Sequence, residues 1–388
     1  MLGTLLKVCA VAVAGLLFAA PALAASPEAE AQFSSGQSAL ARGNAEAARS
    51  EFNKACAAGH LTACTRLGVL VQDGRGGRAD AKRARDLFAR ACDTTMAWSP
   101  ASDAEGCFFL AMMHEAGEGG PVQLERAAYL YARACDIGDG EGCTALVALM
   151  AGAEEALVPI DVSTGDMLAQ LLRLGCLLNH IEACTFMYDN DVPLPSDDEI
   201  MAQQDGLVLF REAHSFPAGT PERTLYAERK AMLTEACDLG VARACARAAW
   251  EWLHGFQGMP VSEEEAATLY LRACAYGDGA GCSETGDRLR TGTDGTKDAE
   301  SAAYAYEMGC LAAYPLACRS LAGMHTRGEI PADLAQARAL ERFVCRSGWG
   351  CATYASMLDK GTGGPVESDE ARRVLKAECD ERGAATNA

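Results

Sequence analysis

Apolar residues recur at helical spacing along this chain, in short blocks that are separated by glycine. The first block runs from Pro27 to about Cys56, and its apolar positions are Ala29, Phe33 and Leu40, followed by Ala45, Ala48 and Phe52. Spacings of three, four and seven residues are typical of one buried helix face. The polar tripeptide Arg42-Gly43-Asn44 divides the block. The pattern therefore predicts a hairpin of two helices.

The same hairpin returns in a register that paired cysteines make visible. Most pairs enclose seven residues, and the eight pairs are Cys56/Cys64, Cys92/Cys107, Cys135/Cys143, Cys176/Cys184, Cys237/Cys245, Cys274/Cys282, Cys310/Cys318 and Cys345/Cys351. The first cysteine of each pair is called the leading cysteine below, and the second the trailing cysteine. Leading cysteines follow one another at 36 residues from Cys56 to Cys92 and again from Cys274 to Cys310. A fixed period of this length indicates an array of helix pairs.

Small and large residues stand at fixed distances from the cysteines, and these distances predict which side chains meet between the helices. Ten residues after the trailing cysteine stand glycines that end the first helix of each pair, namely Gly74, Gly117, Gly255, Gly292, Gly328 and Gly361. Four residues after it stand small residues, Gly68, Ala111, Ala249, Gly286, Ala322 and Ala355. Four residues before the leading cysteine stand aromatic residues, Phe52, Phe88, Tyr131, Tyr270 and Tyr306. We expect the small positions of first helices to receive large side chains of second helices.

One region departs from the register. The distance from Cys184 to Cys237 is about 25 residues longer than the period predicts, and this region includes a run from Glu199 to His214 with helical spacing. We expect an inserted helix or lid-like segment at residues 190–220.

The N-terminus has the pattern of an export signal. Lys7 precedes an apolar run from Val8 to Phe18, and Ala22-Leu23-Ala24 follows as a cleavage motif. We expect residues 1–24 to be a cleaved signal peptide and residues 25–388 to be the mature array, located in the periplasm or secreted. No later run approaches the roughly 18 apolar residues of a membrane span. In an oxidising compartment the paired cysteines would persist as disulfides.

Charge and motif content narrow the function. The formal net charge is −19, which argues against nucleic acid and anionic lipid as partners. An acidic groove would favour basic or cationic ligands. The motifs Ser-x-x-Lys, Gly-x-Ser-x-Gly and His-Glu-x-x-His do not occur, and the cysteines lack the Cys-x-x-Cys spacing of zinc sites. The sequence therefore gives no catalytic residue, no metal site and no cofactor.

The repeated residues resemble a known family. The order Leu67-Gly68-x-Leu70, Gly74-x-Gly76 and Ala84-x-x-Leu87-Phe88-x-x-Ala91-Cys92 is similar to the Sel-one-like repeat (SLR), a relative of the tetratricopeptide repeat, in its secreted cysteine-rich Hcp-type form. The resemblance runs from about Ala29 to Cys379. It implies an all-α fold, a right-handed α-solenoid of about eight to nine disulfide-linked helix pairs with a concave groove.

The resemblance also implies one disulfide in each repeat, and it therefore assigns a bridge to each of the eight cysteine pairs. Cys379 is in phase with the leading cysteines, but Asn387 stands at its partner position. We expect Cys379 to be a free thiol, and we expect a monomer rather than a dimer linked through it.

Function is predicted only in outline. A repeat scaffold that binds a protein or peptide in its groove without catalysis is the leading hypothesis. The alternative, carried by resemblance alone, is an Hcp-type β-lactamase or a protein that binds penicillin or cell-wall fragments. One shared position, seven residues after the trailing cysteine, holds the candidate groove contacts His114, Met150, Trp252 and His325.

Reduction should destabilise the chain steeply. Closing a loop of about nine residues is worth roughly 2.5 kcal/mol per bridge in the chain-entropy model, whereas a domain has only about 5–15 kcal/mol in hand. We expect dithiothreitol to lower the melting temperature by well over a few degrees, measured by circular dichroism with and without reductant. A smaller change would contradict structural disulfides.

Overall fold

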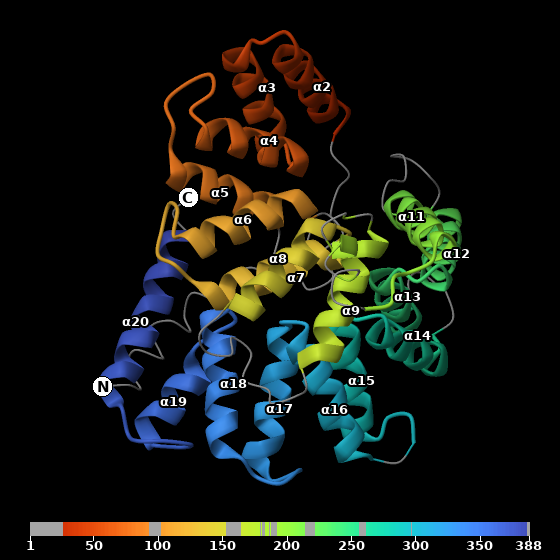
Figure 1. Ribbon diagram of the computed structural model, residues 1–388, viewed down its shortest axis with the longest axis vertical. Coiled ribbons are helices and arrows are strands. Elements are labelled where there is room, and N and C mark those ends of the chain that lie inside the picture. Colours follow the sequence, from red (N-terminus) through yellow and green to blue (C-terminus); the bar gives the residue numbers. More distant parts are fainter. Residues whose placement is uncertain are drawn as a thin grey trace.

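The chain folds as a curved array of antiparallel helix pairs (Figure 1). This computed structural model describes residues 26–92, 102–152, 164–178, 180, 183–185, 187, 192–213, 222–255, 261–295 and 297–385. Every regular element in those ranges is a helix, and none of these helices is long and apolar enough to cross a membrane. The predicted signal peptide lies outside the described residues.

In the described turns, a glycine such as Gly117 or Gly328 separates the first helix of a pair from the second. The first helices are α2 (Pro27–Ala41), α4 (Leu61–Gln72), α6 (Ala104–Ala116), α8 (Gly140–Gly152), α13 (Ala242–His254), α15 (Gly279–Thr291), α17 (Pro315–Arg327) and α19 (Ala352–Lys360). The second helices are α3 (Ala45–Ala57), α5 (Ala81–Ala91), α7 (Leu124–Asp136), α9 (Thr164–Leu177), α12 (Glu222–Asp238), α14 (Glu263–Ala275), α16 (Ala299–Leu311), α18 (Leu334–Arg346) and α20 (Ser368–Ala385). Helix α11 (Asp197–Glu212) lies within the segment expected to be inserted.

The predicted contacts between small and large residues are present in the core. A Cβ built on Gly68 would stand 2.5 Å from the ring of Phe88, and one built on Gly286 would stand 2.6 Å from the ring of Tyr306. Phe88 and Tyr306 are fully buried. A larger residue at either glycine would displace an aromatic ring that the core has no room to move, so these positions fix the spacing of the helices.

Disulfides close the bends between consecutive repeats. All eight predicted pairs are bonded, with Cα–Cα distances from 4.3 to 4.8 Å. The bridges are Cys56–Cys64, Cys92–Cys107, Cys135–Cys143, Cys176–Cys184, Cys237–Cys245, Cys274–Cys282, Cys310–Cys318 and Cys345–Cys351. Each joins the end of a second helix to the start of the first helix that follows it.

The backbone of the bend depends on one position. In every bend where it is described, the third residue after the leading cysteine takes a positive φ, as at Gly138 (φ 101°), so that the chain can leave one helix and enter the next. Ala313 occupies this position in one repeat at φ 53° and is the one non-glycine residue with positive φ in the described part of the chain.

Cys379 lies half-buried in α20 and is disulfide-bonded in the structure of the full chain, to a partner outside the described residues. The expected free thiol is that of the mature chain, residues 25–388. The one cysteine that the eight bridges and Cys379 leave over stands within residues 1–24, the predicted signal peptide, so that expectation stays a prediction.

The array curls until its C-terminal repeats touch α7 (Figure 1). Arg126 donates a hydrogen bond to the Ser347 carbonyl oxygen, and Arg346 Nη1 lies 2.8 Å from Glu125 Oε1. The ring of Trp349 meets the ring of Tyr129 edge-on at 5.9 Å. We call these six residues the clasp. They join segments more than two hundred positions apart in the sequence.

Buried charges lie behind the clasp. Arg243, at the start of α13, approaches Asp136 at 3.7 Å and Asp278 at 3.9 Å. Burial raises the pKa of both carboxyl groups, and Asp278 raises that of Asp136 further. Arg243 and Asp278 belong to consecutive repeats, and Arg243 and Asp136 belong to distant ones. The contact that the curl creates is also apolar, since one buried cluster contains Tyr129 of α7 together with residues of α16, α17 and α18.

Removing the clasp should open the curl without unfolding the helices. Arg126→Ala together with Trp349→Ala removes a charge-assisted hydrogen bond and an aromatic contact, at a cost of about 2 kcal/mol. We expect a larger radius of gyration by small-angle X-ray scattering and an unchanged helical circular dichroism signal.

The matched control is Arg83→Ala. Arg83 stands nine residues before its leading cysteine, as Arg126 does, but its side chain bonds to Asn53 of the neighbouring helix α3. An equal change in radius for both variants would contradict the assignment of the clasp.

Candidate functional site

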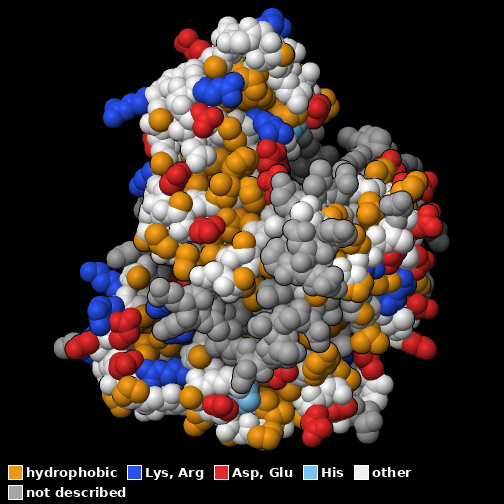
Figure 2. Space-filling view, viewed as in Figure 1, with side chains coloured by type: hydrophobic (Ala, Val, Ile, Leu, Met, Phe, Trp, Pro, Cys, Tyr) orange, Lys and Arg blue, Asp and Glu red, His pale blue; other side chains and the backbone are white. Residues whose placement is uncertain are grey.

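The first helices α6 and α8 begin at the same edge of the array, and a groove of about 650 Å³ lies between their starts. Its lining residues are Thr62, Ser102, Asp103, Ala104, Glu105, Phe108, Phe109, Ile137, Gly138, Asp139, Glu141 and Phe210. We call this the acidic groove. Figure 2 shows hydrophobic side chains along the face of the N-terminal repeats, with acidic side chains at the edge of the hollow beside them.

The carboxylates of the groove are held by the helices that they start. Asp103 accepts a hydrogen bond from the Glu105 amide at 3.2 Å, and Asp139 accepts one from the Glu141 amide at 3.0 Å. An acidic side chain here also faces the positive end of the helix dipole. Two carboxylates are therefore fixed in place, and Glu105 and Glu141 extend from the first turns beside them.

The apolar side of the groove is aromatic. Phe108 and Phe109 follow Cys107 directly, and both are only partly buried. Phe109 stacks on Phe88 at 5.2 Å, and Phe108 packs against Tyr131 at 5.6 Å. These contacts fix the two rings at the mouth of a rigid bend.

Helix α11 supplies the opposite wall through Phe210. It is held against the array at two places: Gln204 Nε2 donates to the Leu177 carbonyl oxygen at 3.3 Å, and Leu207 lies 3.1 Å from where a Gly138 Cβ would stand. Glycine at position 138 thus serves both the bend and the close approach of α11.

The electrostatic field of the groove is negative. Burial raises the pKa of Asp139, and the charges of Glu141 and Glu105 raise it further. Arg66 pairs with Glu105 at 2.7 Å from the edge, but none of the lining residues that the structure describes is a lysine or an arginine. A cation in the groove would relieve this repulsion.

His114 and His325 are buried and do not line the acidic groove. Both are 8% exposed. Arg85 Nη2 lies 2.6 Å from His114 Nδ1, and His325 Nδ1 lies 3.0 Å from the Pro331 carbonyl oxygen. His114 thus joins α6 to α5 of the preceding repeat, and His325 joins α17 to the turn that precedes α18.

Met150 and Trp252 share this position, and it has a structural role in the hairpin. Met150 packs partly buried against the hydrophobic core. The carbonyl oxygen of Trp252 accepts a hydrogen bond from the Ser262 amide, and that of His114 accepts one from Gln123. At Trp252 and His114 the backbone carbonyl thus closes the hairpin onto the start of the second helix. Lys230 lies over the Trp252 ring.

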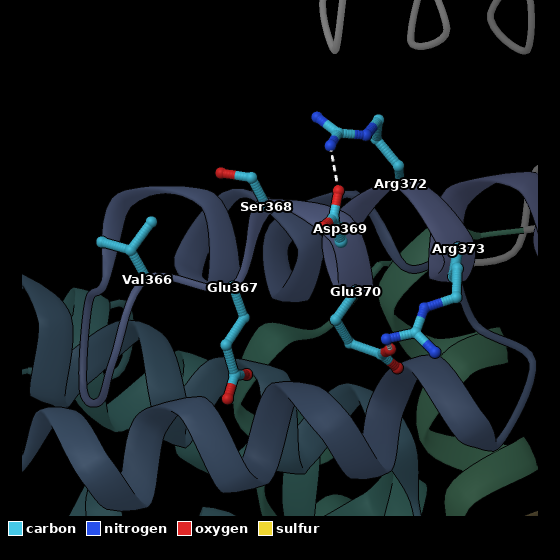
Figure 3. Close-up of a pocket in the computed structure, with 7 residues that line it drawn as sticks. All are labelled: Val366, Glu367, Ser368, Asp369, Glu370, Arg372 and Arg373. Carbon is cyan, nitrogen blue, oxygen red and sulfur yellow. Dashed lines mark hydrogen bonds and ion pairs between the residues drawn. The ribbon is translucent and has the colours of Figure 1, made fainter.

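A second hollow, of about 700 Å³, lies along the start of α20 and is lined by one short segment, residues 366–373. Its charges pair within the helix, Arg372 with Asp369 and Arg373 with Glu370 (Figure 3). No other element walls it, so we give it no role. Among the described residues, no group of three His, Cys, Asp or Glu side chains is placed to hold a metal ion.

The bridging cysteines stabilise the bends, and none of them lines the acidic groove or the hollow at α20. Cys274 and Cys282 line a smaller hollow, of about 150 Å³. Four trailing cysteines line neither the acidic groove nor the hollow at α20 and are all buried: Cys64, Cys245, Cys318 and Cys351. The first three are 0% exposed, and Cys351 is 6% exposed. A ligand in either hollow would therefore meet side chains beside the bridges and would not touch the sulfur atoms of these four residues.

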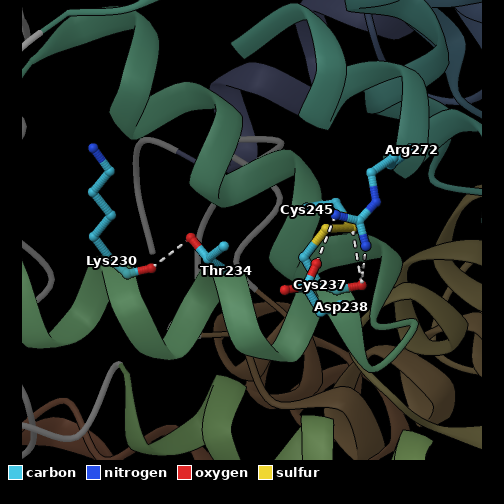
Figure 4. Close-up of a disulfide and its surroundings, with 6 residues drawn as sticks. All are labelled: Lys230, Thr234, Cys237, Asp238, Cys245 and Arg272. Atoms are coloured by element: carbon cyan, nitrogen blue, oxygen red, sulfur yellow. Dashed lines mark hydrogen bonds and ion pairs between the residues drawn. A yellow bond between two sulfur atoms is a disulfide. The ribbon is translucent and has the colours of Figure 1, made fainter. Parts of the chain in front are cut away.

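The sequence analysis missed an arginine that braces the bends. Two residues before the leading cysteine, Arg90 and Arg272 donate to the carbonyl oxygens of Cys56 and Cys237, at 3.1 and 3.2 Å. Figure 4 shows Arg272 reaching Cys237 and Asp238 beside the disulfide with Cys245. Arg133 shares the position and is 2% exposed. The sequence signal for this contact was an arginine repeated two residues before the leading cysteine.

It also missed the acidic groove itself. Asp139 stands four residues after its leading cysteine, and Glu105 and Glu141 stand two residues before their trailing cysteines. The sequence shows that acidic residues recur beside the bends. It does not show that they lie near Phe210, because that depends on where α11 packs.

His114 provides a test of these placements. Burial and the nearby charges of Arg85 and Arg126 lower its pKa from 6.5 to about 3. As the pH falls, the unfolded chain takes up this proton before the folded chain does, so this contribution to stability is complete above pH 6.5 and is lost between 6.5 and about 3. We expect the His114 ring resonances, assigned with a His114→Gln variant, to stay constant by NMR from pH 8 to 5. Titration near pH 6.5 would contradict the buried placement.

Comparison with known proteins gives a family for four segments. Residues 61–93, 104–139, 242–278 and 315–340 match the Sel1 repeat. They coincide with helix pairs, for example α4 with α5 and α6 with α7. No curated protein sequence matches the chain.

Two solved structures are similar over most of the chain. One is a protective antigen present in uropathogenic Escherichia coli strains and displaying an SLR fold, at 16% identity and TM-score 0.36, with 90% of this chain and 80% of that chain covered. The other is a Sel1 repeat protein from Oxalobacter formigenes, at 17% identity and TM-score 0.37, with 92% of this chain and 84% of that chain covered.

Proposed function

Since four of its helix pairs are Sel1 repeats, we propose that this chain is an exported scaffold that binds a protein or peptide in the acidic groove. Sel1 repeats commonly mediate protein interactions. The observation that carries the proposal is the groove itself, in which partly exposed aromatic rings and fixed carboxylates converge from α6, α8 and α11.

The groove suits binding because it is built before a partner arrives. Phe108 and Phe109 are held by ring contacts, Asp103 and Asp139 by backbone amides, and the bends beneath them by the Cys92–Cys107 and Cys135–Cys143 disulfides. A partner then loses less free energy to ordering the site. The volume of about 650 Å³ accommodates several side chains of a partner.

Export is supported by the chemistry of the cysteines. Eight local disulfides persist in a periplasm or outside the cell, whereas cytosolic thiols are kept reduced. The predicted signal peptide at residues 1–24 supports the same proposal.

Site-specific cross-linking tests the groove. A photoreactive phenylalanine analogue at position 108 lies in the groove, and the same analogue at position 304 replaces Tyr304, which is 62% exposed on the second helix α16. We expect irradiation of the exporting cells to give one defined protein adduct from position 108 and none of the same mass from position 304. Purified partner should then re-form the adduct. Equal adducts from both positions, or none from position 108, would contradict the proposal.

A further inference from the structure

Resting on the proposed binding function, we infer that the acidic groove selects a partner segment that carries both Lys or Arg and large apolar side chains. The occupant is a basic, amphipathic stretch of another protein. Phosphate-bearing partners are disfavoured by the same field that favours this one.

The charge of the groove supplies the first half of this inference. Four carboxylates, Asp103, Glu105, Asp139 and Glu141, line one wall. Of these four carboxylates, only Glu105 has an ion pair with another described residue, Arg66 at 2.7 Å. The raised pKa of Asp139 reflects burial and the proximity of Glu141 and Glu105. Lysine or arginine side chains from a partner would complete these pairs in a partly dry site, where they are worth more than in open water.

Acidic residues at helix starts are common, so charge alone does not define the site. Glu300 stands at the same helical position in α16 as Glu141 does in α8, the second residue, and both are exposed. Glu300 serves its helix start and lines none of the hollows described above. The aromatic side chains beside Glu141 are what distinguish the groove.

The apolar side chains of the groove support the second half of this inference, the preference for large apolar residues in the partner. Phe108, Phe109, Ile137 and Phe210 line the groove together, and the first three are only partly buried. Aromatic rings beside carboxylates favour a segment whose apolar side chains can cover the rings while its cations meet the acids. A purely basic or a purely apolar segment would satisfy half of the surface.

The net charge of the whole chain also favours a cationic partner. With a net charge of −19, the protein attracts a cationic segment at long range and repels acidic ones. This attraction raises the association rate, and it weakens as salt screens it. The binding should therefore be salt-dependent, with a residual affinity that the aromatic contacts provide.

Short fluorescent peptides separate these contributions. The probes alternate Lys with Leu, Lys with Ser, Glu with Leu, or Ser with Leu, and affinity is read by fluorescence anisotropy with the oxidised full chain. We expect the Lys-Leu peptide to bind at least about tenfold more tightly than the other three, because it alone satisfies both halves of the groove.

Three variants assign that binding to the groove. Glu141→Lys should weaken the Lys-Leu peptide about tenfold, and Phe210→Ala should weaken it about fivefold. Glu300→Lys is the matched control, because it places the same charge change at the same position of another helix start and should leave the affinity unchanged. Melting temperatures of the three variants identify any loss of folding.

The outcomes distinguish this inference from the function on which it rests. Equal weakening by Glu141→Lys and Glu300→Lys would overturn the inference, because it would show attraction to net charge only. Failure of the Lys-Leu peptide to bind would also overturn it. Equally tight binding of the Ser-Leu or Glu-Leu peptide, lost in Phe210→Ala but kept in Glu141→Lys, would overturn the cationic preference and leave groove binding intact. Groove binding itself fails only if position 108 gives no specific cross-link.

Discussion

The disulfide-closed bend is the constraint on which the rest of the structure depends. With Cα atoms about 4.7 Å apart in Cys135–Cys143, the end of one second helix is fixed beside the start of the next first helix. The positive φ of Gly138 allows that reversal within a few residues. Since the bend is covalently closed, a bond as well as packing holds the two helix ends together. Residues beside a bend, including Asp139 and Glu141, are therefore held at defined positions without support from a deep core.

Consecutive repeats and distant repeats both meet through buried apolar side chains. Gly68 against Phe88 is typical of neighbours, where a small residue receives a buried ring. The curl brings Trp349 against Tyr129, and it adds charged contacts such as that of Arg243 with Asp136. The apolar cluster that contains Tyr129 also contains residues of α16, α17 and α18, so apolar and charged contacts together hold the curl.

Much of the fold followed from the sequence because its information is local. The offsets from the cysteines predicted the helix pairs, the eight bridges and the contact of Gly286 with Tyr306, all within one period of the repeat. The clasp could not be predicted, since it depends on angles accumulated over five repeats. The burial of His114 and His325 could not be predicted from the sequence, because it depends on how Arg85 and Pro331 pack against them.

The departure from the repeat pattern is what gives the array a distinct site. A regular array would offer the same shallow edge at each bend, with an acid such as Glu105 or Glu141 beside each of two consecutive first helices. Helix α11 breaks this equivalence, because it packs at Gly138 and adds Phe210 to a groove that the two partly buried rings of α6 also line. One stretch of the edge thereby becomes a groove with two walls. Regular repeats thus supply a rigid frame, and the irregular helix supplies the enclosure that recognition requires.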